Sequence, residues 1–151
     1  MRDGTDQRQA VTDELLQRGL TRADVGAWQA VVTSGPCAAL GVSHQVEAVM
    51  NWRAFFCLDY VQEWFDSSLD ARDAFEWACA GYSPSQALAV QWCMLERAAA
   101  GDDVGALLDQ EAAWRRSWLR PEQVIRALHA GLTSPTAAER QVLEQERRRS
   151  A

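Results

Sequence analysis

Five carboxylates in the middle of the chain have side chains and spacing suited to binding a basic partner. This acidic row consists of Asp59, Glu63, Asp66, Asp70 and Asp73, at intervals of four, three, four and three residues. On one continuous helix, such spacing places all five on a single face about 20 Å long. Like charges at these intervals each destabilise a helix by roughly a few tenths of a kcal/mol, which a basic partner would offset. The acidic row therefore predicts a surface for a basic protein partner.

The acidic row also has plainer interpretations. Ser67 to Asp70 has the pattern of a capping box, which would end one helix near Trp64 and begin another. The carboxylates would then divide between two helices. The negative charge of Asp70 would stabilise the first turn of the second helix. A face that only contacts solvent is a further alternative. No segment has the spacing of an EF-hand loop, so we expect no metal ion.

Cysteine and histidine give little support for catalysis. The cysteines Cys37, Cys57, Cys79 and Cys93 contain no CxxC pair, which zinc sites use, and each has apolar neighbours. We expect reduced, buried side chains. The two histidines, His44 and His129, belong to no metal-binding or nucleophile motif. The sequence therefore predicts a protein that is not an enzyme and needs no cofactor.

Charge is unevenly distributed along the chain, which has no lysine. The net charge is −1 over residues 1–58, −9 over residues 59–111 and +4 over residues 112–151. The basic segment offers an arginine patch for nucleic acid, formed by Arg115, Arg116, Arg120, Arg126 and Arg140 with the terminal arginines. Its plainer interpretation is a set of solvated helix ends, since arginine near a helix C-terminus complements the helix dipole.

Two stretches carry a resemblance to a known family. LTRADV, from Leu20, and AALGVSHQVEAVMNWR, from Ala38, resemble the helix-turn-helix of phage-repressor-type regulators. The resemblance implies a DNA-binding helix that starts near Ser43. The chain departs from the pattern because about a dozen extra residues separate the two parts. It also has Glu47 where the family packs an apolar residue, and its Trp52 arrives two positions late.

If that helix bound DNA, its polar side chains Gln45, Asn51 and Arg53 would reach bases or phosphates. Phosphate neutralisation by basic residues supplies much of the affinity for duplex DNA. Between Ser43 and Trp64 there is one arginine against three acidic residues. Nucleic-acid binding, through this helix or the arginine patch, therefore remains the alternative function.

Helix signals recur along the whole chain, and no segment alternates apolar and polar residues as a strand would. The sequence predicts an all-α, compact bundle of about seven to nine short helices with helix-turn-helix-like joints. A single domain is expected over residues 1–145, with a frayed basic tail at 146–151. The predicted helices cover residues 6–18, 22–33, 43–65, 68–80, 84–99, 103–118, 121–130 and 135–148.

Glycines and capping residues mark the expected joints. The pattern at Gly81 to Gln86 is the clearest, with a glycine that ends one helix, Ser83 as N-cap and Pro84 in the first turn. Similar patterns begin at Gly19, Gly41 and Gly131. At Gly41 the pattern makes Ser43 the start of a helix.

Helical spacing also predicts the core. The helix over 43–65 should bury Val46, Val49, Met50, Cys57, Val61 and Trp64. Five tryptophans are expected between helices, namely Trp28, Trp77, Trp92, Trp114 and Trp118. Three aromatics near the acidic row, Tyr60, Phe65 and Tyr82, are candidate exposed anchors for a partner.

No apolar run is long enough to cross a bilayer, and the first residues are polar, so we expect a cytoplasmic protein without a membrane partner. Together these features favour a small regulator, adaptor or inhibitor that binds another protein through the acidic row. Pairing of the basic tail with the acidic region of a second copy would give a homodimer.

Overall fold

The computed structural model describes residues 4–34 and 39–151, and within these ranges short turns connect a series of α-helices. They form nine α-helices and no strand, which confirms the all-α prediction. No helix in the described ranges combines the length and the apolar character that a membrane span needs. Cys37 and Ala38, which entered the predictions above, lie outside the described residues.

Tertiary contacts divide the chain into two compact units, residues 1–75 and residues 76–151. The boundary lies inside one helix, α5 (Ala71–Cys79), so this helix contributes residues to both units. The single domain over 1–145 stays a prediction. The last helix continues to Ser150, through the residues predicted to form a frayed tail.

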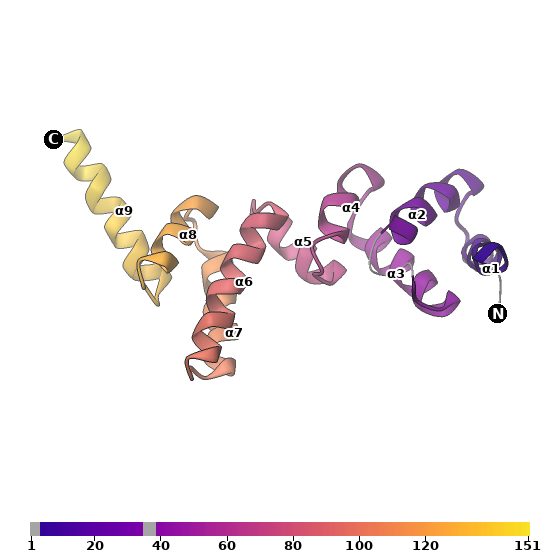
Figure 1. Cartoon of the computed structure of the whole chain (residues 1–151). Helices are drawn as coiled ribbons and strands as arrows, with labels where there is room; N and C mark the ends of the chain where they lie inside the picture. The colour runs from indigo at the N-terminus through magenta and orange to yellow at the C-terminus, as the bar shows by residue number, and fades with distance from the viewer. Residues whose placement is uncertain (1–3, 35–38) are drawn as a thin grey trace. The chain divides into compact units, whose positions relative to one another are not determined.

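The first unit is a packed set of short helices. It contains α1 (Gly4–Gln17), α2 (Arg22–Ser34), α3 (Val42–Phe55), α4 (Leu58–Phe65) and the start of α5. Helix α1 packs on α2 and α3, and α2 also packs on α3 and α4 (Figure 1). Val11, Leu15, Val46, Val49 and Val61 are almost completely buried there.

The prediction of one continuous helix over 43–65 is wrong, because the structure has two helices there, α3 and α4. Phe56 and Cys57 have extended backbone between the two helices. The break directs the Phe56 ring against Trp52, at 5.4 Å between ring centroids, and against Phe75, at 6.2 Å. This aromatic packing is tertiary, so helical periodicity along the sequence did not reveal it.

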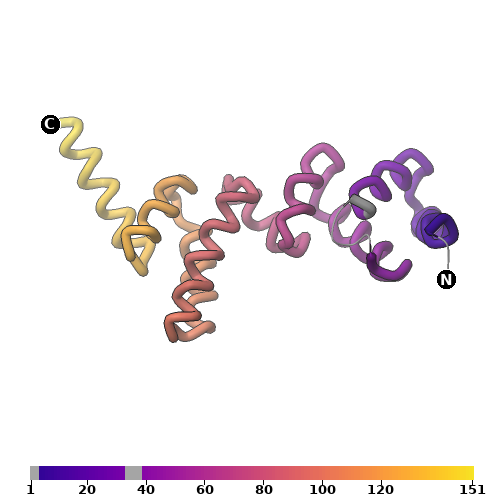
Figure 2. Tube along the Cα trace, in the orientation of Figure 1, coloured from indigo at the N-terminus to yellow at the C-terminus, as the bar shows by residue number. Residues whose placement is uncertain are grey.

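The second unit is built around α6. It contains the end of α5, α6 (Pro84–Ala99), α7 (Val104–Arg116), α8 (Pro121–His129) and α9 (Pro135–Ser150). Helices α6 and α7 form a hairpin whose arms lie side by side, and α6 also packs on α8 (Figure 2). Helix α9 contacts α8. Trp77, Val90, Trp114 and Val124 are fully buried in this unit.

Helix ends follow the predicted chemistry most closely at Gly81. Its φ of +88° is the left-handed conformation that glycine adopts without strain, and Tyr82 N donates to Trp77 O across the helix end. The capping box is present, since Ser83 Oγ accepts from Gln86 N while Gln86 Oε1 accepts from Ser83 N. Gly41 differs from the prediction: it is itself the N-cap of α3, so the helix begins before Ser43.

Two arginines tie the helices of the second unit together. Arg97 on α6 donates from Nη2 to Leu132 O at 2.8 Å and from Nη1 to Gln110 Oε1 at 3.3 Å. Arg115 on α7 forms a 2.8 Å ion pair with Glu76 and stacks over the Trp77 ring. These contacts hold both guanidinium groups within the unit.

Candidate functional site

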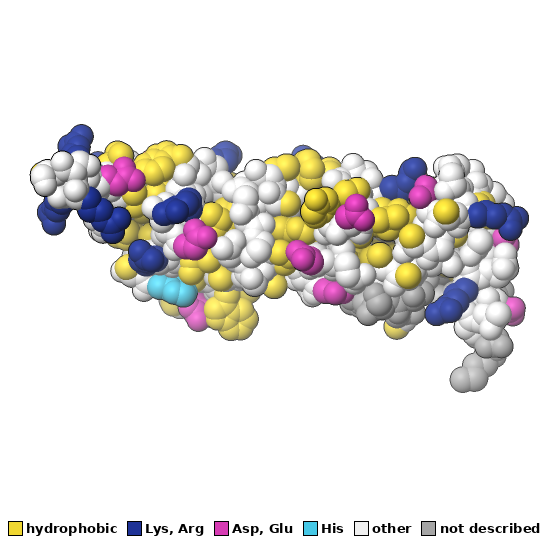
Figure 3. All heavy atoms as spheres, turned by 90° about the horizontal axis from the view of Figure 1, so that it is seen from above, with side chains coloured by type: hydrophobic (Ala, Val, Ile, Leu, Met, Phe, Trp, Pro, Cys, Tyr) yellow, Lys and Arg dark blue, Asp and Glu magenta, His cyan; other side chains and the backbone are white. Residues whose placement is uncertain are grey.

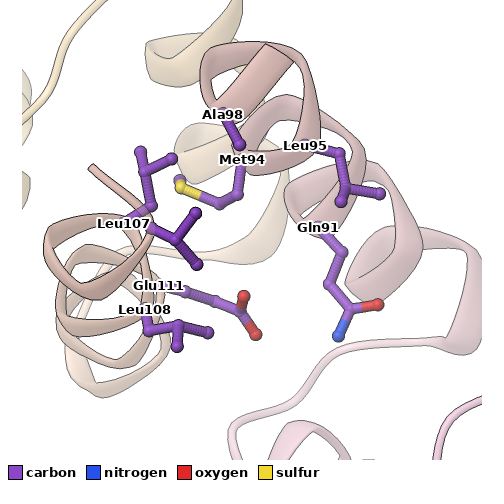
Figure 4. A pocket seen from close by; sticks show the side chains of 8 residues that line it. Gln91, Met94, Leu95, Ala98, Leu107, Leu108 and Glu111 are labelled. Carbon is purple, nitrogen blue, oxygen red and sulfur yellow. The ribbon is translucent and has the colours of Figure 1, made fainter. Parts of the chain in front are cut away.

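An apolar groove separates the two arms of the α6–α7 hairpin. This α6–α7 groove has a volume of about 270 Å³. It is lined by Gln91, Met94, Leu95 and Ala98 from α6, and by Val104, Leu107, Leu108 and Glu111 from α7. In Figure 4 the side chains of the two helices point toward one another across the groove, with the Glu111 carboxylate directed into it.

The groove has a buried floor and exposed walls. Met94 and Leu107 are at most 5% exposed and belong to the core of the unit. The wall residues Leu95, Val104 and Leu108 are 60–61% exposed, although each is a large apolar side chain. Soluble proteins seldom leave contiguous apolar surface of this kind uncovered unless it binds something.

Apolar surface continues along α6 beside the groove. Leu88, Trp92 and Leu95 follow at intervals of four and three residues, so they share one face of the helix. Trp92 is 64% exposed, and its indole Nε1 donates to Glu96 Oε1 at 3.0 Å. This bond holds the ring of an exposed tryptophan at the edge of the groove. Tryptophan is one of the side chains enriched at the energetic centre of protein interfaces.

The charged side chains in the segment that forms the groove are mostly acidic. Residues 84–111 contain five carboxylates, Glu96, Asp102, Asp103, Asp109 and Glu111, against the single basic residue Arg97. Arg97 donates to Gln110 and Leu132, so it helps hold the unit together. Asp103 also caps α7, because its carboxylate accepts from Ala106 N. The groove is therefore lined mainly by apolar side chains, with the Glu111 carboxylate among them, and it lies in a segment with an excess of negative charge.

The acidic row does not form one helical face. Asp59 and Glu63 lie on α4, Asp66 is its C-cap, and Asp73 lies in the first turn of α5. Asp70 precedes α5 and caps it, since its Oδ1 accepts from Asp73 N at 2.8 Å. The divided arrangement is thus the one observed, with Asp70 before the first turn rather than within it. Partner binding by the acidic row stays a prediction.

The predictions for exposed aromatics are corrected by the structure. Of the candidate anchors Tyr60 is exposed, but Phe65 and Tyr82 are buried. Trp92 and Trp118, which were expected in the core, are more than half exposed. Periodicity locates apolar faces, but it does not say which of them the fold covers.

The cysteine predictions are correct for one of the described side chains. Cys93 is buried. Burial is the main cause that raises the pKa of its thiol, and the negative charge of Glu96 is the second. Cys57 and Cys79 are exposed, contrary to the expectation that they are buried. Within the described ranges no group of histidine, cysteine and carboxylate side chains could hold a metal ion.

A second hollow, the α8–α9 groove, contains part of the predicted arginine patch. It has a volume of about 360 Å³ and is lined by Arg120, Glu122, Gln123, Arg126, Val142, Gln145, Glu146 and Arg149. None of its three arginines forms an ion pair within the part of the chain that the structure describes. Basic side chains also gather over α9 in Figure 3. Arg116 and Arg140 are exposed but do not line this groove, and Arg115 is held by Glu76.

In the helix-turn-helix-like stretch, the structure buries one of the predicted base-contacting side chains. Gln45 is buried and donates from Nε2 to Leu40 O at 2.9 Å. Glu47, which departs from the family pattern, is exposed, and Trp52 is buried in the aromatic core. Asn51 and Arg53 are exposed. Of the three predicted base-contacting residues, only these two present side chains to solvent.

Neither a protein-family model nor a curated protein nor a solved structure matches the chain. The two grooves are therefore interpreted from their own side chains.

One sequence signal could have indicated the α6–α7 groove. Helix α6 is apolar on nearly all sides from Ala87 to Leu95, and a surface helix with one partner face should be apolar on one side only.

Proposed function

We propose that the chain is a protein-interaction module that binds a helix of its partner in the α6–α7 groove. The observation that supports this most directly is the exposure of Leu95, Val104 and Leu108 above a buried floor. Helix-in-groove recognition places one apolar helix face into such a channel. Trp92 beside the channel provides an aromatic anchor.

The dimensions of the groove support a helix rather than a small molecule as its ligand. From Leu88 to Ala98 the apolar surface follows α6 for about 15 Å, which corresponds to roughly three turns of a docked helix. The groove is open along its walls, whereas pockets for small ligands enclose most of the ligand surface. An elongated open channel suits the i, i+4, i+7 face of a helix.

Affinity capture with matched variants tests the proposal. The tagged full chain, its Leu108→Arg variant and its Leu143→Arg variant are each used as bait in nuclease-treated native lysate. Leu143 is an exposed leucine on α9, so its replacement introduces the same charge away from the groove. The proposal expects a stoichiometric partner that Leu108→Arg loses and Leu143→Arg keeps. A partner retained by both variants would contradict it.

A second candidate function is nucleic-acid binding through the α8–α9 groove. Its support is the juxtaposition of Arg120, Arg126 and Arg149 without ion-pair partners in the described part of the chain. Glu122 and Glu146 line the same hollow and oppose a polyanion, which is why this function ranks second. It predicts binding to a single-stranded or duplex oligonucleotide that weakens steeply with salt and is lost in Arg120→Gln/Arg126→Gln.

A further inference from the structure

We infer that the helix bound by the α6–α7 groove belongs to a different protein and carries basic side chains beside its apolar face. This inference rests on the proposed function and specifies the chemistry of the partner. It follows from the side chains that surround the apolar walls, and from the contacts of Arg97, the one basic residue in the segment 84–111 that forms the groove.

Carboxylates lie near both apolar walls of the groove, and they would complement basic side chains on a bound helix. The Glu111 carboxylate points into the groove, and Asp102 and Asp103 immediately precede the wall residue Val104. On the other arm, Glu96 accepts the hydrogen bond from Trp92 at the edge of the apolar surface. A helix lying on Leu95 and Leu108 would thus have carboxylates beside both of its flanks. Lysine or arginine at these flanks gains attraction, and acidic residues there are repelled.

The same charges argue against a second copy as occupant. Two grooves placed face to face would bring the carboxylates of one copy close to the carboxylates of the other. Like charges across an interface disfavour association and select against the wrong partner. The basic helix α9 of a second copy is also a poor fit, because its exposed apolar surface is limited largely to Leu143.

The test compares three synthetic helical peptides of about sixteen residues with one identical leucine face at i, i+4 and i+7 spacing. Their flanks are lysine, glutamine or glutamate, and binding to the full chain is followed by the anisotropy of a labelled peptide. We expect the lysine peptide to bind about tenfold more tightly than the glutamine peptide, which corresponds to about 1.4 kcal/mol. The preference should shrink at high salt because the edge of the groove is exposed.

Matched variants locate the effect. Glu96→Gln/Asp102→Asn/Glu111→Gln removes three carboxylates from the groove edge and keeps a side-chain acceptor for Trp92. Each exposed charge pair accounts for a factor of roughly 1.4 to 5 in affinity, so losing three should abolish the tenfold preference. The control Glu122→Gln/Glu144→Gln/Glu146→Gln changes the net charge equally on α8 and α9, away from the groove. It should keep the preference.

The outcomes separate this inference from the proposed function. Equal binding of the lysine and glutamine peptides, abolished by Leu108→Arg, overturns the basic partner and leaves the groove as a helix-binding site. No binding of any peptide, or binding that Leu108→Arg does not reduce, overturns both. A homodimer in sedimentation velocity that Leu108→Arg dissociates would identify a second copy as the occupant, and would also overturn the inference.

Discussion

Neighbouring leucines on α7 allow the interpretation of the α6–α7 groove to be tested by stability alone. Leu107 is 4% exposed and forms the floor, whereas Leu108 is 61% exposed and forms a wall. Truncating a buried leucine to alanine costs about 2–5 kcal/mol, so Leu107→Ala should destabilise the chain by that amount. A fully buried leucine contributes about 1.5–3 kcal/mol. Less than half of Leu108 is buried, so Leu108→Ala should cost about 1 kcal/mol or less.

Urea unfolding of the full chain, followed by far-ultraviolet circular dichroism, measures the free energy of unfolding of both variants. Alanine favours a helix at least as well as leucine, so helix propensity does not mask the difference. In the peptide-binding assay Leu108→Ala should nevertheless have a measurable effect. Although it changes stability little, it should bind the peptide more weakly than the parent chain. If Leu108→Ala lowers the free energy of unfolding by more than about 2 kcal/mol, Leu108 belongs to the structural core. That result would contradict its assignment as an exposed binding residue.

Two further predictions concern the second unit. Burial, with the charge of Glu122 as second cause, raises the pKa of Tyr82 to about 12. Above pH 10 the unfolded state therefore loses this proton first, and stability should fall by about 2–3 kcal/mol towards pH 12. Denaturant titrations at both pH values should show this loss in the parent chain and in the exposed control Tyr60→Phe, but not in Tyr82→Phe. Arg97→Ala removes two hydrogen bonds from a charged donor and should cost about 1–3 kcal/mol in the same assay, against about 0.5 kcal/mol or less for the exposed Arg116→Ala.

Helix ends were predictable because their chemistry is local. At Gly81 and Ser83, a left-handed glycine and a reciprocal capping box need only residues within one turn of each other. The broken helix at Phe56 was not predictable in the same way. Its extended backbone serves packing against Phe75, nineteen residues away, and this contact has no signature in helical periodicity.

The candidate site shows the same distinction. The spacing of the acidic row would place its carboxylates on one face only if a single helix continued from Asp59 to Asp73. Asp70 caps α5, so the row is divided. The α6–α7 groove was missed because several apolar faces compete for one interior. Trp92 was expected between helices, but the packing of α7 and α8 on α6 leaves it outside.

The central claim is that partner helices dock between α6 and α7. Amide chemical-shift mapping of the isotope-labelled full chain during titration with the lysine-flanked peptide tests it most directly. We predict that the largest shifts occur at residues 88–98 and 104–111, with saturation at one peptide per chain. Largest shifts at residues 59–73 would favour the acidic row, and largest shifts on α9 would favour the α8–α9 groove. Either result would contradict the proposed site.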